Sequence, residues 1–376
     1  MTTMELDYSS NGIVRLLETP VRDRSLSWLK TALQQAVMLE LATLPPYLCG
    51  WWSLDDDSES GQAVSAAIRE IIFDEMSHLG HVCNLLTTIG GSPRIGDPGV
   101  VAPYPCPLPG GIKPKINEDL KVYLGGLTTD SVEMYSQIEA PEEPLARFAA
   151  AAGDAGDAET FPSIGRFYTA IQEAFRQHQG EIKGTRQITR NMEGHGQGNS
   201  LFAIRTLADA EAAITIIKEQ GEGTDKTPDN TFPGHKGELS HYYVFREIFK
   251  GHKLVKVQED PPKWDFTGAK IPLPKARPMG KVPLGGWATD KTTAPKDPEV
   301  KAALTAFNQS FSDMLRSLEK AWQMDTQEAA DPHLREAIRV HMRALETPAS
   351  TLMTKPLPND PQHTYGPEFL FVPPKA

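Results

Sequence analysis

Residues 68–86 read IREIIFDEMSHLGHVCNLL, and the spacing of their apolar side chains predicts a helix. The apolar positions recur every three or four residues and form one stripe: Ile68, Ile71, Ile72, Leu79, Val82 and Leu86. Because successive helical residues are about 100° apart, Glu75 and His78 fall inside that stripe. Charged side chains are seldom placed on a core face without a partner. The stretch therefore predicts a buried carboxylate and a buried imidazole that share a partner, for which a metal ion is the obvious choice.

The same Glu-x-x-His spacing returns at Glu238-Leu239-Ser240-His241. Its two polar residues share a predicted helix face with Tyr242, Phe245, Ile248 and Phe249. A spacing of three brings two side chains onto one face of a helix, so that both can reach one metal ion. Short motifs also arise by chance, and a solvated glutamate followed by an unrelated histidine is the alternative. The apolar faces around both motifs favour metal ligation.

A further glutamate, Glu40, lies in the middle of an apolar stripe of an earlier predicted helix. The stripe consists of Leu29, Leu33, Ala36, Val37, Leu41 and Leu44. Glu40 precedes the acidic turn at residues 55–58 by about 14 residues, and Glu75 follows the start of the second helix by about 13, so both lie ~20 Å from the hairpin end. We therefore expect these two carboxylates to meet at one level of an antiparallel helix pair.

The fourth carboxylate is left open by the sequence. Glu173 lies opposite the apolar stripe of its own predicted helix, and Glu211 lies off the centre of the next one. Glu219 and Glu222 end that helix, where Gly221 allows the chain to bend inward. We prefer Glu222, followed by Glu219. The alternative for both is a solvated acidic turn at the helix end.

Helical periodicity covers most of the chain, and strand alternation is scarce. The predicted helices are 25–54, 62–89, 164–178, 209–220, 238–249, 299–323 and 333–345, with a short helix or strand at 120–138. Proline, glycine and acidic residues fill the connections between them. We expect three parts: a di-metal helical bundle at residues 20–255, a Pro-rich linker at 256–298, and C-terminal helices at 299–376 that pack on the bundle.

Composition excludes several classes of function. The 376-residue chain has a formal net charge of -11, which disfavours nucleic acid and anionic membranes because both bind basic surfaces. The first 15 residues lack the pattern of a secretory signal, and no apolar run approaches the length of a membrane span. Three scattered cysteines, Cys49, Cys83 and Cys106, are too few for a disulfide framework. We therefore expect a cytoplasmic protein.

Several stretches together resemble the ferritin-like domain of iminophenyl-pyruvate dimer synthases, enzymes of bisindole and indolocarbazole biosynthesis. They are Glu40-Leu41-Ala42-Thr43-Leu44-Pro45-Pro46-Tyr47-Leu48, the Glu75–His78 helix ending in Ile89-Gly90-Gly91, Ile164-Gly165-Arg166-Phe167-Tyr168, Glu219-Gln220-Gly221-Glu222-Gly223-Thr224 and His241-Tyr242-Tyr243-Val244-Phe245. The resemblance spans about residues 20–250. The C-terminal helices look like the tail of stand-alone relatives.

This resemblance implies a mostly α-helical, ferritin-like four-helix bundle with long irregular crossovers and an additional C-terminal helical segment. It also implies metal ligands at Glu40, Glu75, His78, Glu238 and His241, and its recurrent Gln-Gly-Glu-Gly segment favours Glu222 as the sixth ligand. The dimer synthases are much longer than this chain, so their substrate chemistry is not implied.

Carboxylates with two imidazoles suit two iron ions, with manganese as the alternative, and the absence of thiolates argues against structural zinc. The predicted function is a non-haem diiron oxidase or oxygenase that uses dioxygen on a small amino-acid-derived metabolite, in natural-product biosynthesis. The alternative is a ferritin-like protein that binds metal or handles peroxide without such a substrate. An empty structural scaffold is disfavoured because unpaired buried charge is costly. The sequence does not fix the oligomeric state.

Overall fold

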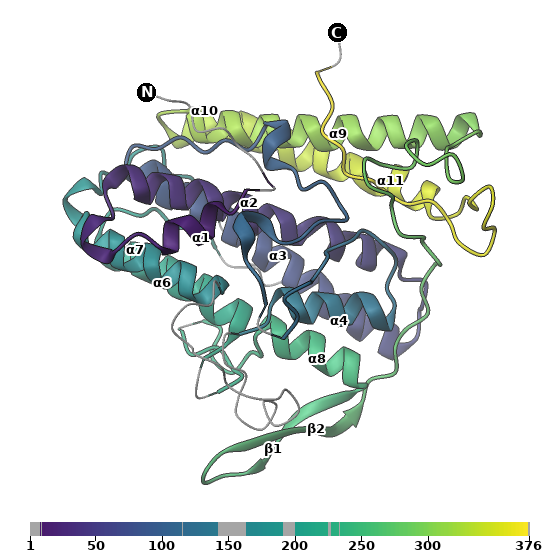
Figure 1. The fold of residues 1–376 in the computed structure, drawn as a ribbon, viewed down its shortest axis with the longest axis horizontal. Coiled ribbons are helices and arrows are strands. Elements are labelled where there is room, and N and C mark those ends of the chain that lie inside the picture. Colours follow the sequence, from purple (N-terminus) through teal and green to yellow (C-terminus); the bar gives the residue numbers. More distant parts are fainter. Residues whose placement is uncertain are drawn as a thin grey trace.

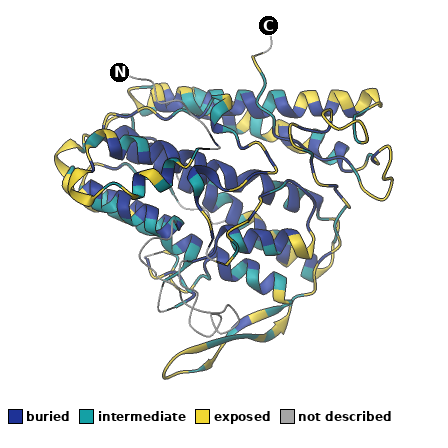
Figure 2. Ribbon diagram, in the orientation of Figure 1, coloured by how far each residue is buried: buried dark blue, intermediate teal, exposed yellow. Residues whose placement is uncertain are grey.

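A long antiparallel helix pair forms the centre of the computed structural model, which describes residues 8, 10–114, 116–141, 163–190, 200–224, 227–232 and 234–374. The pair consists of α2, Leu26–Ser53, and α3, Glu59–Thr88. Ser25 and Ser58 begin these helices as N-caps, each accepting a hydrogen bond from a first-turn backbone N–H. Figure 2 shows both helices almost wholly buried along their middle. The predicted hairpin is therefore present.

Helix α2 continues through Pro45 and Pro46. A proline inside a helix leaves the carbonyl four residues earlier without its usual donor. For Pro46 that carbonyl belongs to Ala42, and the hydroxyl of Tyr104 donates to it at 2.6 Å. Tyr135 donates similarly to the carbonyl of Pro46 at 2.8 Å. Tertiary hydrogen bonds thus satisfy carbonyl oxygens around the two prolines.

Among the described residues, four shorter helices join the bundle: α4, Thr129–Ile138; α6, Ile164–Gln177; α7, Leu207–Glu222; and α8, His241–Lys250. Helices α4 and α6 contact α2, whereas α7 and α8 contact α3. In Figure 1, α6 and α7 lie together at the left, and α4 and α8 lie together near the centre. The third and fourth positions of the bundle are thus each filled by two short helices, whose ends approach the middle of α2 and α3.

A two-stranded antiparallel sheet follows the bundle. Its strands are β1, His252–Gln258, and β2, Lys263–Lys270, with Lys256 opposite Trp264. It projects from the helices at the bottom of Figure 1. The first part of the segment predicted as a Pro-rich linker, 256–298, thus contains strand structure. Trp264, Phe266 and Leu254 pack with Tyr242 and Tyr243 of α8, and this contact stabilises strands whose alternation is too short to be recognised in the sequence.

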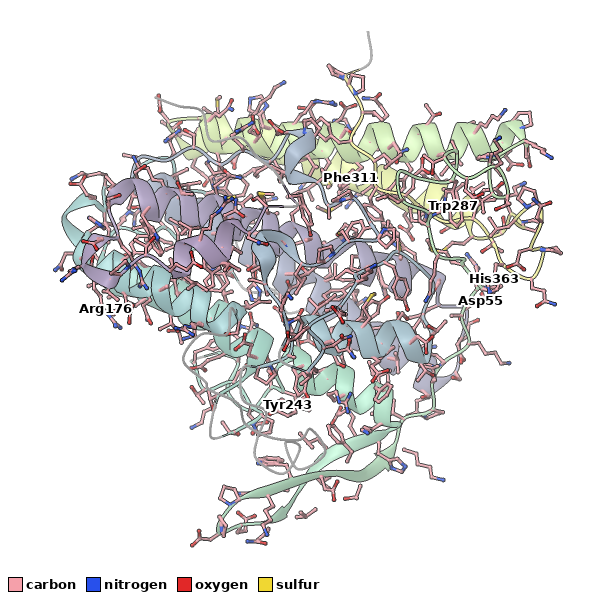
Figure 3. The ribbon with its side chains drawn as sticks, viewed as in Figure 1. Asp55, Arg176, Tyr243, Trp287, Phe311 and His363 are labelled. Atoms are coloured by element: carbon pink, nitrogen blue, oxygen red, sulfur yellow. The ribbon has the colours of Figure 1, made fainter. Side chains whose placement is uncertain are left out.

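A C-terminal layer covers the central helices at the top of Figure 1. It contains α9, Pro298–Gln323; α10, Gln327–Arg335; a π-helical segment η5, Glu336–Met342; and α11, Arg343–Leu352. Helix α9 contacts α3, and α11 contacts α2. Trp287 and Phe311, both labelled in Figure 3, are buried in the core.

The remaining helical elements are short: α1, Gly12–Leu17; η1, Val21–Asp23; η2, Pro98–Val100; η3, Pro109–Gly111; and η4, Gln179–Glu181. The expectation of a mostly helical fold is confirmed. Within the described part of the chain, none of the helices combines the length and apolar character that crossing a membrane requires.

Candidate metal centre

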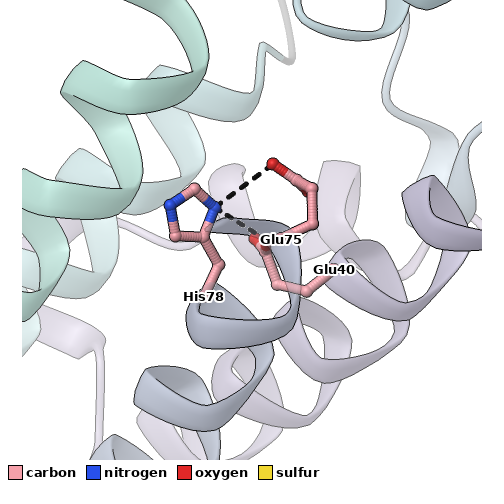
Figure 4. A group of neighbouring side chains, drawn as sticks. All are labelled: Glu40, Glu75 and His78. Atoms are coloured by element: carbon pink, nitrogen blue, oxygen red, sulfur yellow. Dashed lines mark ion pairs between the residues drawn. The ribbon is translucent and has the colours of Figure 1, made fainter. Parts of the chain in front are cut away.

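Glu40, Glu75 and His78 meet halfway along the α2–α3 pair. Nδ1 of His78 lies 3.3 Å from Oε1 of Glu75 and 3.6 Å from Oε2 of Glu40. Dashed lines in Figure 4 mark these two contacts. Thr43, one turn after Glu40, donates to Oε2 of Glu75 at 2.7 Å. All three side chains of this first group are buried, with exposures of 1–4%. The common level predicted for the two glutamates follows from the antiparallel packing of the helices.

Glu75 also belongs to a second group, with Glu139 and His241. Nδ1 of His241 lies 3.0 Å from Oε1 of Glu75 and 3.8 Å from Oε2 of Glu139. Glu139 is the C-cap of α4, and His241 is the first residue of α8. In each group the potential ligand atoms lie within 4.8 Å of one another. The same carboxylate therefore stands between two imidazoles that come from different helices.

Glu139 was missed by the sequence analysis, although a signal for it exists. Val132, Tyr135 and Glu139 are spaced by three and four residues, and all three are buried. A helix extended by one residue beyond the predicted end at 138 places Glu139 on this face. The sequence pattern of residues 120–138 fits either a short helix or a strand, so it does not fix on which face Glu139 lies.

The structure does not bring Glu238 into either group. The expectation that it shares a helix with His241 is wrong, because α8 begins at His241. Asn230 donates its backbone N–H to the carbonyl of Glu238, and Ser240 donates to that of Pro228, so residues 238–240 follow a paired loop. The carboxylate of Glu238 contacts Nδ1 of His235 at 2.7 Å and is 39% exposed.

Glu222 also lies outside both groups. Its Oε1 accepts the backbone N–H of Gly165 at 2.8 Å, at the start of α6. A carboxylate is favoured there because the first N–H groups of a helix lack partners and carry partial positive charge. The other candidates have separate contacts: Glu219 with Thr231, Glu211 with Arg176, and Glu173 with Arg24. Glu139 takes the place in the cluster that the sequence left open.

A second set of polar contacts surrounds the cluster. Nε2 of His78 lies 2.8 Å from Oε1 of Gln220, in the last turn of α7. Nε2 of His241 lies 3.3 Å from Oδ2 of Asp74. The outer carboxylates each accept a phenol, since Tyr168 donates to Glu40, and Tyr47 donates to Glu139 at 2.5 Å. The contacts with Gln220 and Asp74 orient the two rings so that each Nδ1 faces the centre of the cluster.

Burial and mutual charge shift the ionisation of the first group. Burial raises the pKa of Glu40 to about 8, and the charge of Glu75 adds to this effect. Burial by itself would lower the pKa of His78, but Glu75 and Glu40 raise it to about 9. For Glu75, burial would raise the pKa, yet His241 and His78 hold it below its usual range. At neutral pH Glu75 is therefore ionised, whereas Glu40 and His78 carry protons that a cation would displace.

In the second group, burial and the charge of Glu75 raise the pKa of Glu139. Burial opposes the charged form of His241, but Asp74, Glu139 and Glu75 raise its pKa well above the usual value. The five side chains thus form a coupled buried set in which a proton or a cation must neutralise the carboxylates.

Two observations fit a pair of metal ions. Nδ1 of His241 is buried and lies 3.0 Å from Glu75, but it is outside hydrogen-bond geometry, as expected of an atom that faces a shared ion. Both groups also consist of carboxylates and imidazoles, a donor set that suits iron or manganese. Glu40 and His78 would hold one ion, Glu139 and His241 the other, with Glu75 between them.

Comparisons with known proteins identify a ferritin-like family and fold. A family model described as "Ferritin-like" matches residues 33–250, which contain all five clustered side chains. A ferritin-like protein from Caulobacter vibrioides, known from a crystal structure, superposes with a TM-score of 0.58 at 20% identity. The alignment covers 90% of this chain and 98% of that one, and at this identity it shows the fold alone. No curated protein matches the sequence.

Proposed function

This chain belongs to the ferritin-like family, and we propose that it holds two iron ions in the buried cluster, with manganese as the alternative. The proposed ligands are Glu40, Glu75, His78, Glu139 and His241. The observation that supports this most strongly is the shared carboxylate: Oε1 of Glu75 lies 3.3 Å from one inward-facing imidazole nitrogen and 3.0 Å from the other. Glu75 would therefore be within reach of both ions, and each histidine would hold one of them.

The protein residues would fix the ions and exclude water. Tyr168 and Tyr47 hold the outer carboxylates through their hydroxyls, and Gln220 and Asp74 contact the outer nitrogens of the two rings. The exposures of the five ligands are 1–6%, so charge at the centre is little screened by solvent. A pair of iron ions, when bound, supplies redox chemistry, because together the two ions can deliver two electrons to dioxygen.

We further propose that the chain is an oxidase or oxygenase for a small, amino-acid-derived metabolite. This part rests on the resemblance of residues 20–250 to the ferritin-like part of iminophenyl-pyruvate dimer synthases, of which the chain would be a stand-alone relative in natural-product biosynthesis. Its three cysteines are buried and unpaired, which is compatible with the reducing cytoplasm that we propose for it.

One observation favours a second candidate, a metal- or peroxide-handling protein without an organic substrate. Each ligand is at most 6% exposed, so the centre is accessible to dioxygen or peroxide more readily than to a metabolite. The two candidates share the metal centre and differ in whether an organic molecule is needed for turnover.

Metal analysis followed by oxygen consumption tests the proposal. Protein prepared anaerobically with Fe(II) should retain about two ions per chain, and Glu75→Gln should retain fewer than one because both ions share this ligand. Less than half an ion per wild-type chain would reject the metal centre. Oxygen uptake above the metal content that requires an added amino-acid-derived metabolite would select the oxidase. Uptake that stops at the metal content, or turnover with peroxide alone, would select the second candidate.

A further inference from the structure

The two groups of the cluster are built alike around Glu75. In each, one histidine directs Nδ1 toward Glu75 and one outer carboxylate, which is Glu40 for His78 and Glu139 for His241. In each, Nε2 of the ring points away from the centre and contacts a buried oxygen atom. With Nδ1 bound to a cation, Nε2 carries the hydrogen and donates it to that oxygen.

The oxygen atoms behind the two rings differ in chemistry. His78 contacts the amide oxygen of Gln220, which is neutral, whereas His241 contacts a carboxyl oxygen of Asp74. Both partners are buried, with exposures of 1% for Gln220 and 6% for Asp74. Asp74 and Glu75 are neighbours on α3, so consecutive residues contact the two nitrogens of the same His241 ring. The two groups therefore differ in the charge of the residue that contacts Nε2 of the histidine.

A carboxylate behind an imidazole makes the inner nitrogen a stronger donor to a metal ion, and it adds a negative charge close to the cation. A neutral amide orients the ring without adding charge. The Asp74 contact, at 3.3 Å, is longer than the Gln220 contact, at 2.8 Å. Because Coulomb energy falls only as the inverse of distance, this difference weakens the interaction by roughly a sixth. The negative charge of Asp74 should therefore stabilise a bound cation more than the neutral amide of Gln220 does, although its contact is longer.

The surroundings add to the asymmetry. Glu70 lies one helical turn before Asp74 on α3 and is close enough to both Asp74 and His241 to interact with them electrostatically. A further acidic side chain therefore lies near the half of the cluster around His241.

We propose that the cluster binds two divalent cations with unequal affinity, and that the half formed by Glu75, Glu139 and His241 fills first because Asp74 lies behind His241. Gln220 takes the same place behind His78 and leaves the other half weaker. The inference rests on the proposed di-metal centre and assigns Asp74 and Gln220 as positioning residues that set the order of loading.

Titration with Mn(II) tests this order, with the EPR signal of free Mn(II) as the readout. Wild-type protein should bind two ions in two separate phases whose dissociation constants differ by about 10–100-fold, the usual effect of a residue behind a metal ligand. The His78→Ala variant retains the half of the cluster with His241 and Asp74. The His241→Ala variant retains the half with His78 and Gln220. The single ion of the His78→Ala variant should bind more tightly by a factor in the same range.

Exchanging the outer partners separates a specific role from a structural one. Asp74→Asn in the His78→Ala background should weaken the remaining ion about tenfold, and in the His241→Ala background it should change little. Gln220→Glu in the His241→Ala background should strengthen binding. Both replacements are nearly isosteric. If circular dichroism shows that Asp74→Asn prevents folding, the affinity of the Gln220→Glu variant still tests whether a carboxylate behind the histidine strengthens binding.

Two equal affinities in the wild-type protein, or tighter binding by the His241→Ala variant, would overturn the inference and leave the di-metal centre intact. Equal effects of Asp74→Asn in both backgrounds would also overturn it, since they indicate a structural role. Wild-type protein that binds neither Mn(II) nor Fe(II) would overturn the proposed function itself.

Discussion

Glu75 contacts residues from three helices, whereas its Glu-x-x-His motif predicts a contact with His78 alone. It lies on the apolar stripe of α3, accepts the hydroxyl of Thr43, and faces the inward nitrogens of His78 and His241. Its position between two imidazoles holds its pKa below the usual range despite complete burial. In the metal-free protein, Glu75 is therefore the ionised carboxylate between the two imidazoles.

Replacing Glu139, which lies in the cluster, should reduce the metal content, whereas replacing Glu238, which lies outside it, should not. Glu139→Gln keeps an oxygen for the Tyr47 hydroxyl but loses a ligand charge, so the protein should retain about one metal ion per chain instead of about two. The matched control is Glu238→Gln, which lies in the loop before α8 and should retain the full content. Metal content measured after gel filtration checks both. If Glu238→Gln lost metal and Glu139→Gln did not, the result would support Glu238, as predicted from the sequence, as a ligand instead of Glu139.

Metal uptake should strengthen with rising pH. The pKa of Glu40 is about 8 and that of His78 about 9, so both are protonated in the metal-free protein at pH 7. Ligands must lose these protons to bind a cation, so affinity should rise by about tenfold per pH unit for each proton released. Calorimetric titration with Mn(II) in two buffers of different protonation enthalpy measures the number released. A pH-independent affinity between pH 6 and 8 would contradict these ionisation states.

At the scale of elements, the site is assembled where short helices end. Helix α4 ends at Ile138 with Glu139 as its C-cap, α7 ends just after Gln220, and α8 begins at His241. Their side chains meet the midpoints of α2 and α3, so the placement of these ends decides which residues line the centre. Helix ends are the part of a helix that a sequence specifies least closely.

The close contact between α2 and α4 can be tested at Gly50. A Cβ atom added there would lie 2.5 Å from the hydroxyl oxygen of Tyr135, which itself donates to the carbonyl of Pro46. Gly50→Ala should therefore destabilise the protein by about 1–3 kcal/mol from overpacking, although alanine is the better helix former. Urea unfolding provides the free energy.

Tyr135→Phe removes the obstructing hydroxyl and serves as the partner variant. On its own it should cost about 1 kcal/mol for the lost hydrogen bond to Pro46. In the double variant, Gly50→Ala should cost at least about 1 kcal/mol less than it does in the wild-type protein, because the clash is gone. Strictly additive effects would show that α2 and α4 are farther apart than described.

At the scale of the whole molecule, Asn84 connects three separate parts of the chain. Its side chain donates to the carbonyls of Ile188 and Phe202, and it accepts from the backbone N–H of Ile188 and the indole N–H of Trp322. Asn84 lies on α3 and Trp322 on α9, so this fully buried amide links the bundle to the C-terminal layer.

Asn84→Ala should lower the free energy of unfolding by about 2–6 kcal/mol, because it leaves the N–H groups of Ile188 and Trp322 buried without their acceptor. Urea unfolding followed by tryptophan fluorescence measures the loss. Asn359→Ala, which removes one exposed hydrogen bond to Thr292, is the control and should change stability by less than about 0.5 kcal/mol. An equal effect of the two variants would contradict the role of Asn84.

Apolar periodicity was enough to predict the helical class, the α2–α3 hairpin and the meeting of Glu40, Glu75 and His78, because these features depend on continuous helices. His241 was also identified, although the helix expected to carry Glu238 beside it starts later. Contacts between distant residues were needed to show that Glu139 completes the cluster, that Glu222 accepts a backbone N–H at the start of α6 and that residues 252–258 and 263–270 form strands. Helix ends and isolated strands are fixed by contacts between residues far apart in the chain, such as the pairing of residues 228–230 with 238–240, and local periodicity carries no information about such contacts.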